Sequence, residues 1–243
     1  MNTLDLAKEG PVIPVIVINR VEDAVPMAEA LLEGGIKVLE VTLRTSCALA
    51  GMEAIAKAVP EAILGSGTVR NNKDAQASKD AGCKFAVSPG YTSELGQFAR
   101  QIGLPLLPGV STGSEIMTAN ADDYYFLKLF PAVAVGGINL LKGFAGPFGD
   151  VKFCPTGGVT VESAPQFLAL PNVVVCGGPW LTPADAVALK NILQGKLHLY
   201  RGTFGSGTVQ GIFAEDVSDE YQYAGDGSDN GYHGVALFAE VVT

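Results

Sequence analysis

The sequence is short of basic charge and of long apolar runs. It holds 16 lysines and arginines against 25 aspartates and glutamates, a formal net charge of −9. A surface that binds nucleic acid or an anionic membrane needs a basic patch, so neither partner is expected. No segment reaches the ~18 uninterrupted apolar residues of a membrane span. The apolar opening from Pro11 to Asn19 lacks a basic flank, so it is not expected to be a signal peptide.

Cysteine and histidine are scarce, with four and two residues. Both histidines, His198 and His233, follow residue 195, so the first part of the chain has no histidine base. The cysteines form no C-x-x-C pair, which predicts free thiols in a reducing cytoplasm and no zinc site. They are Cys47, Cys83, Cys154 and Cys176. We expect no metal and no cofactor.

Apolar residues are abundant, at 48% of the chain, which is enough for a large core. Over residues 1–195, runs rich in β-branched residues alternate with amphipathic segments, a pattern typical of βα units. Eight such runs predict a closed (β/α)8 TIM barrel, of the α/β class. A doubly wound open sheet is the alternative, but its G-x-G-x-x-G fingerprint is missing. The eight runs are 11–19, 37–44, 62–69, 84–90, 104–110, 124–132, 151–158 and 172–180.

One lysine stands in an otherwise apolar run, "YYFLKLFPA" from Tyr124. Side-chain alternation puts Lys128 on a face opposite two leucines, and puts Glu40 and Arg44 on one face of the second run. Barrel strands send one face to the helices and the other to the axis. The apolar faces suit the helix layer, so the three charged side chains are expected to face the barrel interior.

Position along the strands separates the lysines further. Lys37, Lys84 and Lys152 open their runs and belong to the stabilising end of a barrel, whereas Lys128 lies late in its run. Active sites of such barrels lie at the carboxyl ends of the strands. The buried charges could form a structural ion-pair network. Alternatively, desolvation favours the neutral amine, which attacks a carbonyl to form a Schiff base, with a glutamate moving protons and an arginine binding a carboxylate.

Glycine pairs follow the last two predicted strands, in "PTGG" from Pro155 and "CGGPW" from Cys176. Loops after strands seven and eight are the common phosphate site of a barrel. These glycines could also serve only to make tight turns. Two pairs in adjacent loops favour a phosphate-bearing substrate.

The composition changes after residue 195. Residues 196–243 hold seven acidic and two basic residues and are rich in glycine. Two β-like runs, Gly207–Glu215 and Gly234–Val242, bracket a polar stretch. We expect a divergent, polar, acidic C-terminal appendage that contains a β-hairpin.

The ordered motifs of residues 10–186 resemble the 2-keto-3-deoxy-6-phosphogluconate (KDPG) aldolases, also known as 4-hydroxy-2-oxoglutarate (KHG) aldolases. The most specific are "EVTLRT" and "FCPTGG"; the others are "PVIPVIVI", "GSGTV", "FAVSPG", "PLLPGVST", "KLFPA", "AGPF" and "GGPWL". The resemblance implies a metal-independent homotrimer in the cytoplasm. It implies a Schiff-base role for Lys128 and a proton-transfer role for Glu40. It further implies substrate binding by Arg44, Thr68, Pro89, Phe130, Thr156, Gly157, Gly158, Gly177 and Gly178.

Within this family, Arg44 and Thr68 are expected to hold the pyruvate carboxylate, Phe130 to lie beside the pyruvyl group and Thr156 to meet substrate hydroxyls. Three features depart from the family pattern: Pro179 where serine is usual, Val133 where glutamate is usual, and the tail after Gln194.

The sequence therefore predicts a class I aldolase that cleaves KDPG to pyruvate and glyceraldehyde 3-phosphate. The alternatives are cleavage of KHG to pyruvate and glyoxylate, and a barrel used as an assembly or binding scaffold.

Overall fold

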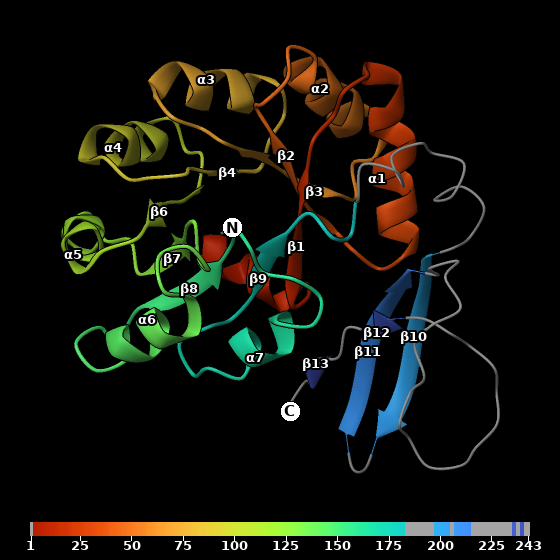
Figure 1. Cartoon of the computed structure of the whole chain (residues 1–243). Helices are drawn as coiled ribbons and strands as arrows, with labels where there is room; N and C mark the ends of the chain where they lie inside the picture. The colour runs from red at the N-terminus through yellow and green to blue at the C-terminus, as the bar shows by residue number, and fades with distance from the viewer. Residues whose placement is uncertain (1, 183–196, 205–206, 215–234, 237–238, 241–243) are drawn as a thin grey trace.

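The computed structural model describes residues 2–182, 197–204, 207–214, 235–236 and 239–240. In the first of these ranges, short parallel strands alternate with helices, and Figure 1 shows the helices α1 to α7 arranged around the strands. The strands are β1 Val12–Ile16, β2 Val38–Thr42, β3 Ile63–Gly67, β4 Phe85–Val87, β5 Leu106–Leu107, β6 Gly109–Val110, β7 Phe126–Leu129, β8 Lys152–Pro155 and β9 Cys176–Gly178. The fold is therefore a curled, parallel α/β fold.

The strands form two parallel sheets, ordered β5-β4-β3-β2-β1-β9 and β6-β7-β8. Pro108 alone separates β5 from β6, because proline has no N–H to donate to a ladder. The predicted run 104–110 is thus two strands rather than one. Isolated bridges link Phe153 to Val173 and Thr156 to Gly177, on the β8 and β9 sides. The structure contains two curled parallel sheets and not the single closed barrel that was predicted, because the hydrogen-bonded ladder is not continuous.

The helices follow the predicted alternation with the strands. They are η1 Thr3–Lys8, η2 Val21–Asp23, α1 Ala24–Glu33, α2 Ala48–Ala58, α3 Asn72–Asp80, α4 Ser93–Gln101, α5 Gly113–Ala121, α6 Gly137–Phe144 and α7 Ala164–Leu168. Asn71, Thr92 and Thr112 each accept a hydrogen bond from a backbone N–H of the first turn that follows. Such N-caps fix where a helix begins, and each typically stabilises the fold by ~1 kcal/mol. The predicted eighth helix, residues 183–195, lies outside the described residues, as does the expected domain boundary.

Two apolar layers flank the strands, of which alternation predicted the one that faces the helices. Leu39, Val41, Leu127 and Leu129 pack with residues of the helices in the largest core cluster. A smaller cluster gathers side chains from the other face, where Leu6 of η1 also packs. Its members are Leu6, Ile13, Val38, Phe85, Val87, Leu107, Phe126, Cys154 and Val175. Each large apolar side chain so buried contributes roughly 1.5–3 kcal/mol.

The described C-terminal residues form a separate antiparallel sheet. Strands β10 Leu197–Phe204 and β11 Gly207–Ala214 pair as a hairpin, and β12 Val235–Ala236 and β13 Ala239–Glu240 both pair with β11. Sequence patterning predicted a hairpin here and singled out the β11 run, but it missed β10. The polar stretch 215–234 lies outside the described residues.

Candidate active site

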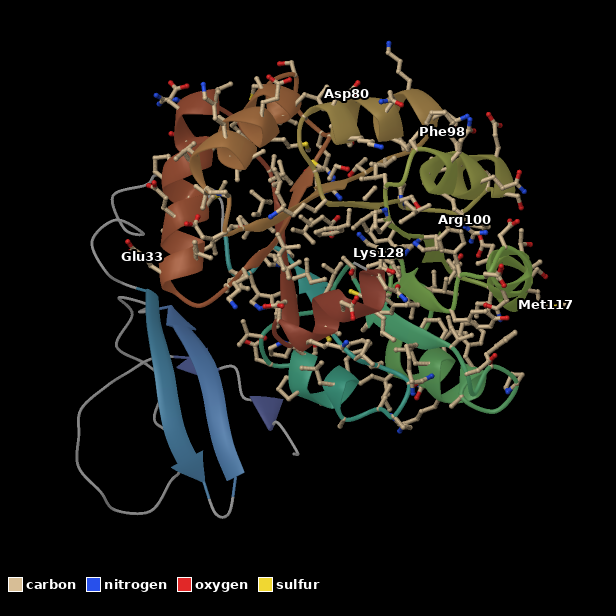
Figure 2. All side chains as sticks on the ribbon, turned by 180° about the vertical axis from the view of Figure 1, so that it is seen from behind. Glu33, Asp80, Phe98, Arg100, Met117 and Lys128 are labelled. Carbon is tan, nitrogen blue, oxygen red and sulfur yellow. The ribbon has the colours of Figure 1, made fainter. Side chains whose placement is uncertain are left out.

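Lys128 lies in β7 and faces the interior. Its Nζ donates a hydrogen bond to Oε1 of Glu40 in β2 at 3.3 Å, although the two residues are 88 positions apart. The residues are only 4% and 3% exposed. Because β2 and β7 belong to different sheets, this contact crosses the interior. Figure 2 shows Lys128 deep among the side chains, in contrast to Glu33, Asp80 and Met117 at the periphery.

Arg44 does not join this buried pair. Its side chain is exposed, and Nε donates to Oγ1 of Thr68 at 3.2 Å. In the described part of the chain, no salt bridge involves Arg44. The alternative of a three-charge structural ion-pair network is therefore not what the structure contains. It contains one buried ion pair, with an exposed arginine that has its own hydrogen-bond partner.

A buried ion pair is a poor device for stability, since desolvation cancels much of the Coulombic attraction. Removal of one partner of such a pair typically costs ~3–5 kcal/mol, because the other charge is left uncompensated. Two apolar residues at positions 40 and 128 would stabilise the fold at least as well as this lysine and glutamate. The presence of the charged pair therefore favours a chemical role over a structural one.

Thr68 adopts an unusual backbone conformation directly after β3. Its φ is 62°, in the left-handed region that β-branched residues rarely enter. Such strain, of order 1–3 kcal/mol, concentrates at functional sites. Nearby, the hydroxyl groups of Thr42 and Thr45 donate to the carbonyls of Ile16 and Ile18. These bonds tie the carboxyl ends of β1 and β2 together and fix the turn that carries Arg44.

The aromatic side of the site is built by the segment after β7. Nζ of Lys128 lies 5.2 Å from the centroid of the Phe130 ring. Gly157 lies against that ring, since a Cβ placed on it would be 3.3 Å from two ring atoms. Gly109, in register with Lys128, leaves room for the backbone of Pro89. The structure thus brings Phe130, Gly157 and Pro89 around the lysine.

The predicted glycine pairs differ from each other. Gly157 and Gly158 follow β8 with φ of 96° and 78°, so an L side chain would be strained there. Gly177 and Gly178 instead belong to β9 and pair in register with Ile13 and Pro14 of β1. Their environments are also crowded. A Cβ on Gly177 would collide with the hydroxyl of Thr156, and one on Gly178 would collide with the ring of Trp180.

A buried thiol lies beside the lysine. Cys154 of β8 is in register with Lys128, and burial raises the pKa of its thiol to about 12. The group is therefore neutral at physiological pH and adds no charge to the floor of the site. All four cysteines are free, as predicted.

Exposure increases from this floor toward the carboxyl ends of the strands. Thr156 is buried, Thr68, Pro89, Phe130 and Gly157 are half-buried, and Arg44 and Gly158 are exposed. The amine and carboxylate are thus deeply buried, and the residues nearer the carboxyl ends of the strands are more exposed.

A depression of about 420 Å³ lies near the amino ends of the strands, lined by residues such as Leu106, Phe126 and Lys152. The cations there are occupied, since Lys152 donates to the carbonyl of Pro171 and Arg100 donates to that of Asp122. It offers no reactive group comparable to the pair of Lys128 and Glu40.

Among the described residues, no group of three or more histidine, cysteine, aspartate or glutamate side chains is placed to hold a metal ion. No described helix combines the length and apolarity needed to cross a bilayer.

Sequence reasoning missed the glycines that face the interior in β3 and β6, Gly65, Gly67 and Gly109. A Cβ on Gly65 would collide with the Phe85 ring, and one on Gly67 would collide with the Glu40 side chain. Alternation on β3, with Leu64 on the helix side, could have shown that these glycines share the face of Glu40.

Comparison with known proteins identifies the family. The family model for KDPG and KHG aldolase matches residues 4–194. The KHG/KDPG aldolase of Escherichia coli K12 is 51% identical over 178 residues, 73% of this chain and 84% of that protein. The 2-dehydro-3-deoxy-phosphogluconate aldolase of Dickeya dadantii is 50% identical over the same coverage.

A solved structure of the Legionella pneumophila KDPG aldolase, with pyruvate captured as a covalent carbinolamine, has a TM-score of 0.77 at 44% identity. The match covers 79% of this chain and 93% of that one. The Zymomonas mobilis enzyme with 3-phosphoglycerate has a TM-score of 0.72 at 43% identity, over 79% and 95% of the two chains. By motif order, site geometry and overall similarity, this chain belongs to the KDPG and KHG aldolase family.

Proposed function

We propose that this protein is a class I aldolase that cleaves KDPG to pyruvate and glyceraldehyde 3-phosphate. One observation carries the proposal: a buried amine, Nζ of Lys128, lies 3.3 Å from a buried carboxylate, Oε1 of Glu40. A Schiff-base mechanism needs this combination of a nucleophilic amine in a dry recess and a proton carrier beside it.

In the first half of the reaction, the ammonium of Lys128 gives a proton to Glu40, and the free amine attacks C2 of the keto acid. Glu40 then returns its proton to the new C2 oxygen and takes one from the nitrogen, which gives a neutral carbinolamine. Glu40 gives that proton to the C2 hydroxyl, which leaves as water, and the nitrogen lone pair forms the iminium. The contact of 3.3 Å allows the transfer from Nζ to Oε1 to be direct. In the proposal, one water carries the proton between Glu40 and the C2 oxygen.

In the second half, Glu40 accepts the proton of the C4 hydroxyl as the C3–C4 bond breaks. The electron pair of that bond moves to the iminium, which becomes the enamine of pyruvate, and the aldehyde leaves. Glu40 gives this proton to C3, which forms the iminium again. Water then attacks C2, which releases pyruvate and leaves Lys128 as the ammonium that began the cycle. No oxidation takes place, so the cycle balances without a redox partner.

The remaining residues bind the substrate in this proposal. Arg44 and Thr68, which contact each other at 3.2 Å, hold the pyruvate carboxylate. Phe130 and Pro89 flank the pyruvyl group, and Thr156 meets the substrate hydroxyls. The phosphate lies over the two glycine pairs, Gly157 and Gly158 after β8 and Gly177 and Gly178 at the end of β9. Backbone N–H groups of such loops, with a helix N-terminus nearby, are the usual support for a phosphate.

We also propose that the two parallel sheets complete one (β/α)8 barrel over residues 1–195. The bridges between the β8 and β9 sides, and the single proline between β5 and β6, support closure at both seams. The tail 196–243 is then an appendage.

A homotrimer and a cytoplasmic location complete the proposal. The free thiols suit a reducing compartment. A designed cage built from symmetric oligomeric domains is 25% identical to this chain, which agrees with self-association.

The direct test is reduction with borohydride in the presence of pyruvate, followed by peptide mass mapping. The expected result is a stable adduct on the peptide that contains Lys128, together with pyruvate release from KDPG in a coupled assay. A protein that labels elsewhere, or not at all, would contradict the proposal. A barrel that served only as a scaffold would release no pyruvate.

A second candidate activity, cleavage of KHG to pyruvate and glyoxylate, is favoured by the end of β9. Pro179 has no N–H, and Trp180 lies over Gly178, so fewer donors remain there for a phosphate. Comparison of kcat/KM for the two substrates separates the candidates. Pro179→Ser restores an N–H and a hydroxyl. It is expected to raise kcat/KM for KDPG by about tenfold, the value of one good hydrogen bond, and to leave KHG cleavage unchanged.

A further inference from the structure

Gly67 ends strand β3 and faces the interior beside the buried pair. Strand β3 runs parallel to β2, with Gly65 in register with Glu40 and Gly67 in register with Thr42. The Glu40 side chain therefore reaches along the sheet toward Gly67. A Cβ placed on Gly67 would lie 2.8 Å from Cγ and 2.9 Å from Cδ of Glu40, and closer still to Oε1. The space where a side chain would stand is filled by the carboxylate.

Backbone conformation does not explain this glycine. Gly67 is absent from the glycines with positive φ, so its backbone is open to any L residue. Glycine in a strand is unfavourable because it loses the most conformational entropy on folding and offers no side chain for packing. At this position the missing Cβ must therefore be useful for another reason, and the Glu40 contact supplies one.

We infer that Gly67 is a positioning residue for the reaction: its missing side chain sets where the Glu40 carboxylate lies, and so holds Oε1 against Nζ of Lys128. The inference rests on the proposed function. Non-bonded carbon atoms prefer about 3.5–4.0 Å, so alanine at 67 would force the carboxyl group to move by about 1 Å. A displacement of this size at a reacting group is expected to slow catalysis by about 10²-fold.

The neighbouring Gly65 shows why the effect should be functional rather than structural. A Cβ on Gly65 would strike the rigid ring of Phe85, which is fully buried and has no free space to enter. A Cβ on Gly67 meets the Glu40 side chain instead, which has rotatable bonds and can shift without moving the backbone. Gly67→Ala should therefore leave the fold intact while it moves the carboxylate.

The test is a double-mutant cycle with Gly67→Ala and Glu40→Gln. The single Gly67→Ala variant is expected to lose about 10²-fold in kcat with little change in KM. It should remain folded with only a modest fall in Tm, because the buried ion pair is stretched and neither partner is removed. In the Glu40→Gln background the same change should cost less than about threefold, because the carboxylate it displaces is already gone. Gly143→Ala, on helix α6 with no atom near the added methyl group, is the matched control and should retain full activity.

A kcat for Gly67→Ala within about threefold of the unmodified protein would overturn the inference. An equal loss in both backgrounds would also overturn it, because Gly67 would then act independently of Glu40. A crystal structure of Gly67→Ala is the readout that does not depend on activity: the Nζ to Oε1 distance should exceed 3.3 Å. If the unmodified protein neither cleaves KDPG nor traps pyruvate, the proposed function fails, and this distance still decides whether Gly67 places the carboxylate.

Discussion

The two ends of the strands use lysine in opposite ways. At the amino ends, Lys84 donates to the carbonyls of Pro60 and Ala62 at 3.0 and 2.7 Å, and Lys152 donates to that of Pro171 at 2.9 Å. Lys37 pairs with Glu9 at 3.4 Å on the surface. Lys128, late in β7, is 4% exposed and bonds a carboxylate across the interior.

Depth and partner account for the difference. An amine at the rim stays hydrated while it satisfies carbonyl groups, so its charge costs little and its chemistry is ordinary. An amine taken out of water loses that hydration and depends on a single carboxylate for compensation. The same residue type, on strands of the same fold, is therefore a structural clamp at one end and a candidate nucleophile at the other.

The largest loss of activity is expected from substitution of Lys128, the lysine at the carboxyl ends of the strands. Lys128→Arg should abolish pyruvate release, because a guanidinium stays protonated and cannot form the imine. A coupled assay of pyruvate and borohydride trapping measure the loss. Lys84→Arg is the matched control and should cleave KDPG at a near-normal rate. Activity that survives in Lys128→Arg, or a comparable loss in Lys84→Arg, would contradict the different roles given to lysines at the two ends of the strands.

Neutralising the carboxylate of Glu40, the partner of Lys128, is expected to have a smaller effect on kcat. Glu40→Gln keeps the size of the side chain and its contact with Lys128 but cannot accept a proton. We expect kcat to fall by roughly 10² to 10⁴-fold, the usual contribution of a general acid or base. Borohydride trapping should still succeed on long incubation, because the amine remains. A kcat near that of the unmodified protein would move the proton transfer to another group.

Stability at alkaline pH tests how well the Cys154 thiol, which lies between the two ends of the strands, is shielded from water. Burial raises the pKa of the Cys154 thiol from 9.0 to about 12, so the folded protein keeps this proton while the unfolded chain loses it. The resulting stability is fully present below pH 9 and declines as the pH rises toward 12. The shift corresponds to a loss on the order of 4 kcal/mol across the window.

Denaturant unfolding at several pH values between 8 and 12 measures this decline. Cys154→Ala removes the titrating group, so the stability of that variant should fall less steeply with pH. Identical slopes for the variant and the unmodified protein would show that the thiol does not titrate in a dry environment.

The smallest effects are expected at the amino ends. Lys84→Met removes the amine from two carbonyl groups and should lower the free energy of unfolding by about 1–2 kcal/mol, with kcat unchanged. Lys37→Met breaks only an exposed pair and should change stability by less than ~1 kcal/mol. A large change in kcat from either variant would mean that this end of the fold takes part in the reaction.

Local patterning predicted much of the site because it depends on short-range geometry. Alternation along β2 and β7 is a property of any extended chain, so it placed Glu40 and Lys128 opposite the helix layer before any contact was known. Thr68 and Phe130 were suggested by the family resemblance instead, and their places in the site remain predictions. Alternation overestimated Arg44, because it gives a direction but not a depth, and this side chain is exposed just beyond its strand.

Other features depended on packing between distant segments. The break at Pro108 follows from its missing N–H, yet only the pairing of the neighbouring strands shows that one predicted run divides into β5 and β6. Strand β10 was missed because its partner β11, rather than its own composition, makes it a strand. Gly67 gave no signal as a single letter, since its importance lies in the side chain that fills its place.

The sequence by itself determined the order of strands and helices, which face of each strand is apolar, and which residue types were available for Schiff-base chemistry. These properties are local, since the backbone repeats every two residues in a strand and every 3.6 in a helix. Only the tertiary structure decided that an amine and a carboxylate 88 residues apart meet at 3.3 Å. That contact depends on how the sheets curl and on the absent Cβ atoms that leave room inside them.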